Sequence, residues 1–159
     1  MVRPMPTCND HRMRIVGAFI ADSVERTPNG LLNVRGGYPE VWNVPGLPSV
    51  QDIGLALVLE VEPREIDQKF VLVAEIKRTR DDKQLIAVEI TFVRGSYSDV
   101  VTGGALYHHI VANLHLEFLE AGRHEISIRG DDDVEALIRF GVRVRPRSFE
   151  PTVETEPLL

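Results

Sequence analysis

The clearest structural signal in the chain is the stretch Ile53-Gly54-Leu55-Ala56-Leu57-Val58-Leu59-Glu60-Val61. Successive side chains of a β-strand point to opposite faces, so residues two apart share a face. On that spacing one face of the stretch is wholly apolar, and it consists of Leu55, Leu57, Leu59 and Val61. The other face carries Ala56, Val58 and Glu60. This pattern predicts a strand in the core of the protein.

The same alternation recurs along the chain in both directions, and turn residues such as Asn29-Gly30 and Asp81-Asp82 separate the apolar runs. Residues 105–119 also repeat apolar side chains every four positions, as a helix would, and we favour a strand for their second half. The other strands expected are 14–24, 31–35, 68–78, 85–94, 125–129 and a last one that ends at 140–145. The sequence thus predicts an all-β fold, an antiparallel β-sandwich of about seven or eight strands, Ig-like or C2-like, with a barrel as the alternative closure.

Three segments do not follow this alternation. Residues 36–50 contain several Gly and Pro, and we expect a crossing loop there with Trp42 as its anchor. Residues 95–107 exceed the usual length of a hairpin loop, so they form a candidate binding edge. Residues 134–138 are compatible with a single short helix capped by Asp133.

The length of 159 residues predicts one domain, large enough to form a core without metal or disulfides. We expect an N-terminal arm at 1–13, the β-sandwich domain at 14–145 and a Pro/Glu-rich C-terminal tail at 146–159. The single cysteine, Cys8, has no second cysteine to bond with in this chain. Because the first residues lack the apolar core of a secretory signal, we expect a cytoplasmic protein, or a virion protein if the chain is phage-encoded.

The net charge of the chain limits the kinds of molecule that it is expected to bind. The chain carries 18 Lys and Arg against 24 Asp and Glu, a formal net charge of -6. This excess of acid argues against a general affinity for nucleic-acid phosphates or anionic lipid. No stretch of the sequence has the length and apolar character of a membrane span.

Turn and packing residues occur in a distinctive order. The first hairpin contains Ala21-Asp22-Ser23-Val24, and it is followed by Gly36-Gly37, Trp42 and Pro45-Gly46-Leu47-Pro48. Near the end of the chain, Ala121-Gly122-Arg123-His124-Glu125-Ile126-Ser127-Ile128 precedes the strand Phe140-Gly141-Val142-Arg143-Val144. Over about residues 14–145 this order resembles an uncharacterised bacterial all-β domain family of unknown function. The resemblance implies a small all-β sandwich and no activity.

The five histidines are the first candidates for metal chemistry, because four of them fall between His108 and His124. On a strand His109 and His115 share a face, yet they lie about 20 Å apart at about 3.3 Å per residue, too far for one ion. The acidic turn Asp131-Asp132-Asp133 alone supplies too few oxygens for calcium. We therefore expect no metal or cofactor, and keep His109 and His115 as a weak alternative site.

Nucleophilic catalysis finds little support in the sequence. Cys8 lies in the expected arm with Asp10 and His11, where nothing fixes the orientation of a thiolate and its base. Gly36-Gly37 and Gly103-Gly104 lack the helix and lysine of a phosphate-binding loop. We predict that the protein is not an enzyme.

Two groups of side chains are candidates for binding a partner. A basic stripe on one face of the last expected strand, suited to an acidic surface, consists of Arg139, Arg143 and Arg145. The aromatic side chains of the expected long loops are Tyr38, Trp42 and Tyr97. Such aromatics anchor interfaces when they are exposed and close the ends of a sandwich when they are buried, and for Trp42 we favour burial.

These observations favour binding over catalysis. We predict a non-enzymatic protein–protein binding module, an accessory or assembly part of a larger bacterial or phage complex. It would engage a protein partner, or further copies of itself, through its long loops and terminal extensions. The alternative is a small-ligand or metal-binding β-sandwich that uses the 95–109 loop and the nearby histidines. A sugar-binding sandwich would need the loop aromatics exposed together as a platform.

Overall fold

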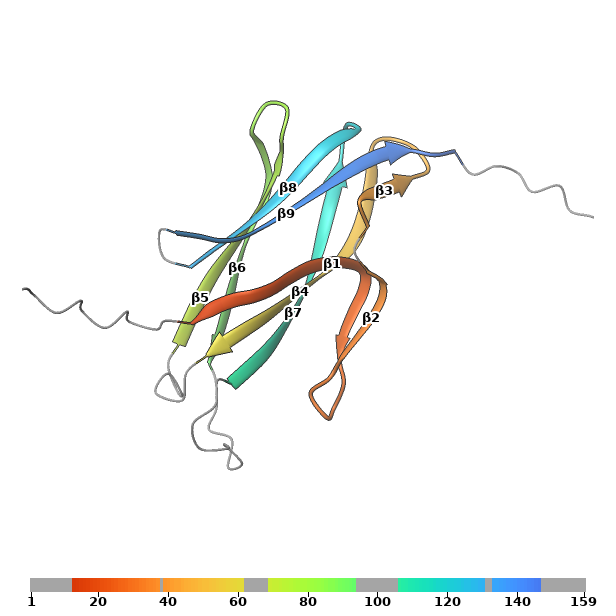
Figure 1. Cartoon of the computed structure of the whole chain (residues 1–159). Coiled ribbons are helices and arrows are strands. Elements are labelled where there is room, and N and C mark those ends of the chain that lie inside the picture. The colour runs from red at the N-terminus through yellow and green to blue at the C-terminus, as the bar shows by residue number, and fades with distance from the viewer. Residues whose placement is uncertain (1–12, 38, 62–68, 94–105, 131–132, 147–159) are drawn as a thin grey trace, which may run out of the picture.

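The computed structural model describes residues 13–37, 39–61, 69–93, 106–130 and 133–146, which form nine strands (Figure 1). The strands are β1 (Arg14–Arg26), β2 (Leu32–Gly37), β3 (Val41–Val44), β4 (Ser49–Val61), β5 (Lys69–Arg78), β6 (Lys83–Val93), β7 (Leu106–Phe118), β8 (Gly122–Gly130) and β9 (Asp133–Val144). A four-stranded sheet has the order β2-β1-β4-β7, and a five-stranded sheet has the order β3-β9-β8-β5-β6. Within these ranges there is no helix, and so none that could cross a membrane.

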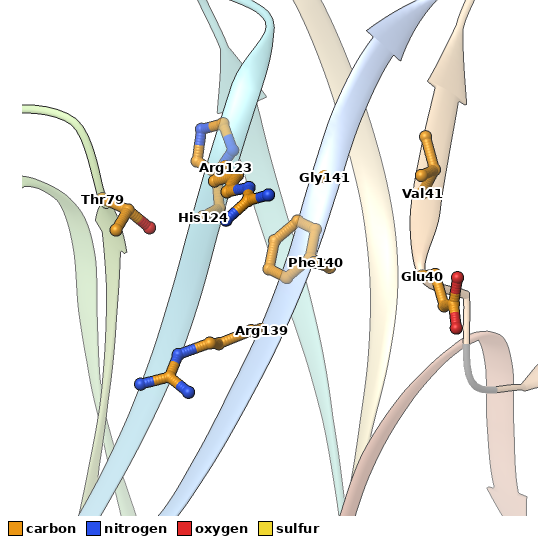
Figure 2. A pocket seen from close by; sticks show the side chains of 8 residues that line it. All are labelled: Glu40, Val41, Thr79, Arg123, His124, Arg139, Phe140 and Gly141. Carbon is orange, nitrogen blue, oxygen red and sulfur yellow. The ribbon is translucent and has the colours of Figure 1, made fainter.

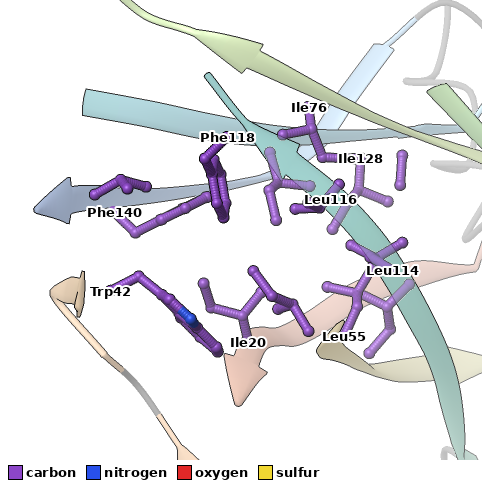
Figure 3. Close-up of a cluster of buried hydrophobic side chains, with 14 of the residues drawn as sticks. Ile20, Trp42, Leu55, Ile76, Leu114, Leu116, Phe118, Ile128 and Phe140 are labelled. Atoms are coloured by element: carbon purple, nitrogen blue, oxygen red, sulfur yellow. The ribbon is translucent and has the colours of Figure 1, made fainter. Parts of the chain in front are cut away.

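The two sheets pack face to face, which confirms the predicted β-sandwich. The apolar face expected on residues 53–61 is fully buried at Leu55, Leu57 and Leu59. Facing it from the other sheet are the inward side chains of β5 and β8, including Leu72, Ile76, Ile126 and Ile128. Figure 3 shows part of this cluster, with Phe118 and Phe140 at one end. Burying each Leu or Ile of this kind contributes about 1.5–3 kcal/mol to folding, so the core between the sheets is the main source of stability.

The crossing loop predicted at 36–50 contains one whole strand, β3, and the first residues of β4, and the Gly and Pro residues of the segment concealed both. Strand β4 already begins at Ser49, and the short β3 pairs in parallel with β9, so the sandwich is not antiparallel throughout. The alternation in β3 is brief but regular. Trp42 and Val44 are buried in the core, and Val41 and Asn43, which alternate with them, are exposed. Burial of Trp42, the outcome favoured from the sequence, removes its indole from the surface.

The short helix considered for 134–138 is wrong, because this segment belongs to β9. Alternate side chains of β9 point into the core and pack there, namely Ala136, Ile138, Phe140 and Val142. Residues 106–118 likewise form one continuous strand, β7, which resolves the helix-or-strand ambiguity for the whole segment. Both corrections follow from burial, which favours the period of two over a local helical spacing. At the other end of the domain, Met13 packs against the core although we expected it in the arm.

The β1–β2 hairpin covers part of the outer face of the four-stranded sheet. Ala21 of β1 pairs with β4 on one side and with β2 on the other, and Figure 1 shows β1 bending between these two pairings. A second hydrophobic cluster forms there from Phe19, Ala21, Val24 and Ala56, flanked by Leu32 and Val111. At the tip of the hairpin, the carbonyl oxygen of Gly30 lies 3.1 Å from Nδ1 of His109 on β7. The hairpin thus reaches across the sheet to its far edge.

His124 is a buried polar residue of the main core. Its ring is only 2% exposed, stacks on Phe140 at a centroid distance of 5.6 Å and meets Phe118 edge-on at 5.2 Å. The Nδ1 atom donates a hydrogen bond to the carbonyl oxygen of Gly122 at 3.1 Å. Burial lowers the pKa of His124 from its ordinary value of 6.5, and the charge of Arg78 acts in the same direction against the Gly122 hydrogen bond. His124 is therefore packed as a structural residue of the core.

Gly54 marks the closest approach between the hairpin and β4, and it supplies a test of this packing. A Cβ atom at position 54 would lie 2.8 Å from both the backbone nitrogen and Cγ2 of Val24. Because the backbone of the hairpin would have to move, we expect Gly54→Ala to lower the free energy of unfolding by about 1–3 kcal/mol. Urea denaturation measures this loss.

A matched control is Gly141→Ala in β9, where the nearest atom to the added Cβ, Cγ2 of Val41, lies at an ordinary 3.6 Å. Alanine fits a strand backbone better than glycine does, so this variant should be as stable as the wild type or slightly more stable. Equal losses in both variants would contradict the assignment of close hairpin packing at Gly54.

His124 also predicts how stability depends on pH. Since its pKa is lower in the folded chain, the unfolded chain binds more protons below about pH 6.5. The free energy of unfolding should therefore fall between pH 7 and pH 5, by at most about 1.4 kcal/mol per pH unit from this group. Asp81, whose pKa Arg78 lowers to about 2, acts only below about pH 4. In His124→Phe the slope of unfolding free energy against pH should flatten between pH 7 and pH 5. An unchanged slope in this variant would show that other groups cause the pH dependence.

Candidate binding surface on the five-stranded sheet

Four neighbouring strands bring one row of residues together on the outer face of the five-stranded sheet. Thr79, which follows β5, donates its backbone N–H to the carbonyl oxygen of Arg123 in β8 at 2.9 Å. Arg123 pairs with Gly141 in β9, and Gly141 pairs with Val41 in β3. The backbone N–H of Gly141 also donates to the carbonyl oxygen of Glu40 at 2.8 Å. Backbone pairing therefore fixes the position of every member of this row.

A shallow hollow of about 370 Å³ lies over this row (Figure 2). Its lining residues are Glu40, Val41, Thr79, Arg123, His124, Arg139, Phe140 and Gly141. Gly141 stands in the middle of the row and has no side chain, so the surface is recessed there between Val41 and Arg123. Figure 2 shows the guanidinium groups of Arg123 and Arg139 over β8 and β9, with the Glu40 carboxylate on the opposite side.

The arginines around the hollow are weakly held. Arg139 is 74% exposed, and its Nε lies 3.8 Å from the carboxylate of Glu125. Arg143, the next outward-facing residue along β9 after Gly141, reaches only the amide oxygen of Asn43, at 3.3 Å from two of its nitrogens. The structure pairs the Arg123 guanidinium with no acidic group of the described residues. These three guanidinium groups keep most of their hydrogen-bonding capacity for another molecule.

Other arginines of the same sheet are held by acidic neighbours. Arg129 forms an ion pair with Glu75, a residue that is largely buried on β5. Arg78 is 12% exposed and binds both Asp81 and Glu120, and these partners raise its pKa further above its usual value. Arg129 and Arg78 are thus fixed by close ion pairs within the sheet, whereas the arginines around the hollow are not. A guanidinium fork matches a carboxylate in two parallel hydrogen bonds, so the hollow is chemically suited to an acidic side chain.

The residues predicted to bind a partner fall in different places in the structure. Arg139 and Arg143 lie on the face with the hollow, and the exposed Arg145 follows β9 and donates its backbone N–H to the carbonyl oxygen of Val44. Trp42 is in the core and takes no part in a surface site. Tyr38 and Tyr97 lie outside the described residues. The described residues therefore give no aromatic platform of the kind a sugar-binding sandwich would need.

His109 and His115 lie on the other sheet and have separate partners. His109 faces the Gly30 carbonyl, as described above, and His115 contacts the carboxylate of Asp52 on β4 through Nδ1 at 2.6 Å. Among the residues that the structure describes, no three His, Cys, Asp or Glu side chains form a group that could hold a metal ion. The alternative of a ligand site in the 95–109 loop lies largely outside the described residues, which resume at 106.

The sequence did not single out Arg123, Gly141 or Glu40 as members of one site. Arg123 lies outside the strand expected at 125–129, and Gly141 is one of 12 glycines in the chain. Their proximity depends on the register between β8 and β9 and on the parallel pairing of β3, neither of which periodicity reveals. The one feature of the sequence that indicated this surface was the basic stripe on β9, which lies on the same face of the sheet as the hollow.

Several solved structures are similar in fold at low sequence identity. The alkylpurine DNA glycosylase AlkC of Pseudomonas fluorescens, solved with DNA containing an abasic site analog, aligns with a TM-score of 0.45 and 17% identity. The alignment covers 83% of this chain and only 30% of the AlkC chain. An immunoglobulin-like protein from Pseudomonas aeruginosa aligns with a TM-score of 0.44 and 15% identity, over 83% of this chain and 97% of that chain. For a beta-glucosidase from Listeria innocua the TM-score is 0.42 and the identity 9%, over 65% and 14% of the two chains.

The sequence was also compared with curated proteins and with sequence families. No curated protein matches it. A family described only as a "Family of unknown function (DUF6941)" matches residues 16–143, nearly the span over which we expected a resemblance to an uncharacterised domain family. That expectation is confirmed, and the chain belongs to the family of unknown function DUF6941.

Proposed function

We propose that the protein is a non-enzymatic binding module, an accessory or assembly part of a larger complex, and that it holds an acidic segment of a protein partner. The binding surface is the outer face of the five-stranded sheet around the Gly141 hollow. The observation that carries this proposal is the pair of arginines, Arg123 and Arg139, that lines a recess of about 370 Å³, with Arg143 as the next outward-facing residue along β9. A partner carboxylate entering the recess would meet the guanidinium groups of Arg123 and Arg139, which both line it.

The distribution of charge supports this choice of partner. The chain as a whole carries a net charge of -6, yet two arginines, Arg123 and Arg139, line the hollow against one carboxylate, that of Glu40. A local patch of opposite sign to the whole protein orients an approaching acidic segment, while the remaining surface repels it from other sites. Such exposed charges chiefly determine the rate of association and its dependence on salt. We place the module in the cytoplasm, as expected from the sequence.

The first test reverses one charge at the hollow and measures capture of the partner. Tagged wild-type protein and Arg139→Glu are used to capture proteins from cells of the source organism, and bound proteins are quantified by mass spectrometry. We expect an acidic partner to be retained by the wild type and reduced about tenfold or more by Arg139→Glu, equivalent to about 1.4 kcal/mol. Raising the salt concentration should weaken capture by the wild type.

Two further variants separate the hollow from general electrostatics. Arg35→Glu makes the same change in charge on β2 of the other sheet, where the side chain is exposed, and should leave capture unchanged. Gly141→Val fills the recess without changing any charge, in a place where an added Cβ has ordinary contacts, and should reduce capture. Equal losses in Arg35→Glu and Arg139→Glu would refute a specific site. A monomer that captures nothing but carries a stoichiometric metal ion or small molecule would favour the ligand-binding alternative.

A further inference from the structure

Strand β7 is one of the two edge strands of the four-stranded sheet, and in the described residues only its side toward β4 is paired. Every residue from Leu106 to Phe118 pairs with a residue of β4, without a register shift along the strand. In an antiparallel ladder alternate residues point their N–H and C=O groups away from the partner strand. Half of the backbone groups of this 13-residue strand are therefore directed outward, and no strand of the described residues pairs with them.

The edge of β7 lacks the features by which proteins usually protect such strands. Edge strands are commonly short, bulged, or marked by Lys or Pro, because unpaired backbone groups recruit other chains. Of the other edges in the described sheets, β2 has six residues and β3 has four, and β6 begins at Lys83. Strand β7 is long and regular and contains no Lys, Arg or Pro. Its edge is therefore competent to pair with another strand.

The flank of the molecule at β7 also includes the free edge of β6. At one end of this flank, the rings of Phe92 and His108 stack at a centroid distance of 5.7 Å. At the other end, a hollow of about 230 Å³ lies between the strands and is lined by Lys83, Gln84, Leu85, Ile86, His115, Leu116, Glu117 and Leu119. The exposed Leu119 borders this hollow, so the flank offers apolar surface beside its unpaired backbone.

The side chains along β7 are complementary to those of a second β7 that runs antiparallel and is centred on Asn113. The outward-facing pairs in that register are Tyr107 with Leu119, His109 with Glu117, and Val111 with His115. Tyr107 near the start of β7 and Leu119, which directly follows the strand, are exposed large apolar side chains, 61% and 50% exposed, and each would cover the other. A register centred on Ala112 would instead place His109 opposite His115. Directly facing apolar side chains stabilise strand pairing, and the carboxylate of Glu117 can accept a hydrogen bond from the ring of His109.

We propose that the protein forms a symmetric dimer in which β7 of one copy pairs antiparallel with β7 of a second copy about Asn113. The four-stranded sheets of the two copies would then form one continuous sheet. A two-fold axis through Asn113 makes the contact isologous and closed, so pairing stops at two copies. The contact lies away from the Gly141 hollow and does not depend on the binding function proposed above.

The dimer is tested by sedimentation of the full chain together with Asn113→Lys. Two lysines would face each other at the two-fold axis, so this variant should be monomeric while the wild type is dimeric. The matched control is Asn33→Lys, which places the same exposed residue on the β2 edge and should leave the dimer intact. A monomeric wild type at high micromolar concentration, or a dimer that Asn113→Lys leaves unchanged, would overturn the proposal.

Disulfide formation tests the register independently of any loss of stability in the lysine variant. In a Cys8→Ser background, Asn113→Cys should form a dimer under mild oxidation, because directly opposed residues have Cα atoms about 4.5–5.5 Å apart, within disulfide range. Val111→Cys should not, since position 111 faces position 115 of the second copy. Equal cross-linking at both positions, or none at 113, would refute the register about Asn113.

Discussion

Strand β4 is buried on both of its faces, and much of the fold follows from covering them. Its inner face packs against the five-stranded sheet through Ile53, Leu55, Leu57 and Leu59, all inaccessible to solvent. Its outer face has only Gly54 and Ala56 at its centre, and the β1–β2 hairpin lies over them. Small residues are needed there because the backbone at Val24 approaches β4 too closely for a larger side chain. The long, bent β1 is the element that satisfies both requirements, since it pairs with β4 in its first half and with β2 in its second.

This arrangement decides which surfaces remain open. The hairpin occupies part of the outer face of the four-stranded sheet and reaches β7 at His109. The outer face of the five-stranded sheet has no such cover in the described residues, and its strands carry charged side chains in cross-strand pairs. Where acidic partners are close, as for Arg129 with Glu75, these pairs tie neighbouring strands together. Around Gly141 the contacts to acidic groups are looser, since the Glu125 carboxylate lies 3.8 Å from Nε of Arg139 and the Arg139 side chain is 74% exposed. The outer face of the five-stranded sheet therefore has two parts: one in which ion pairs such as Arg129–Glu75 join strands, and one around Gly141 whose arginines can contact another molecule.

Periodicity predicted the strands that bury one continuous apolar face, as residues 53–61 and 68–78 do, because burial itself imposes the alternation. It failed where the period was too short to recognise, in the four residues of β3, and where local spacing allowed a helix, at 134–138. The second cluster under the hairpin was not predicted, since nothing local to β1 shows that the strand bends and crosses its own sheet. The candidate site was predicted only through Arg139 and Arg143. Its other members come from β3 and β8, and their positions depend on pairings between segments up to about a hundred residues apart, such as Asn43 with Arg143.

The cations around Gly141 carry a cost in the isolated domain, and this bears on their role. Arg139 and Arg143 occupy the outward positions on either side of Gly141, each about 7 Å from it along the strand and about 13 Å from the other. Arg123 pairs directly with Gly141, so its charge lies between theirs. Like charges at such distances repel, weakly in water and more strongly as solvent is excluded. A fold selected for stability alone would place an acidic or apolar side chain at position 141, where space for one exists. Glycine at the centre instead leaves the three cations without a shared counter-charge, and an acidic group bound in the recess would relieve their repulsion.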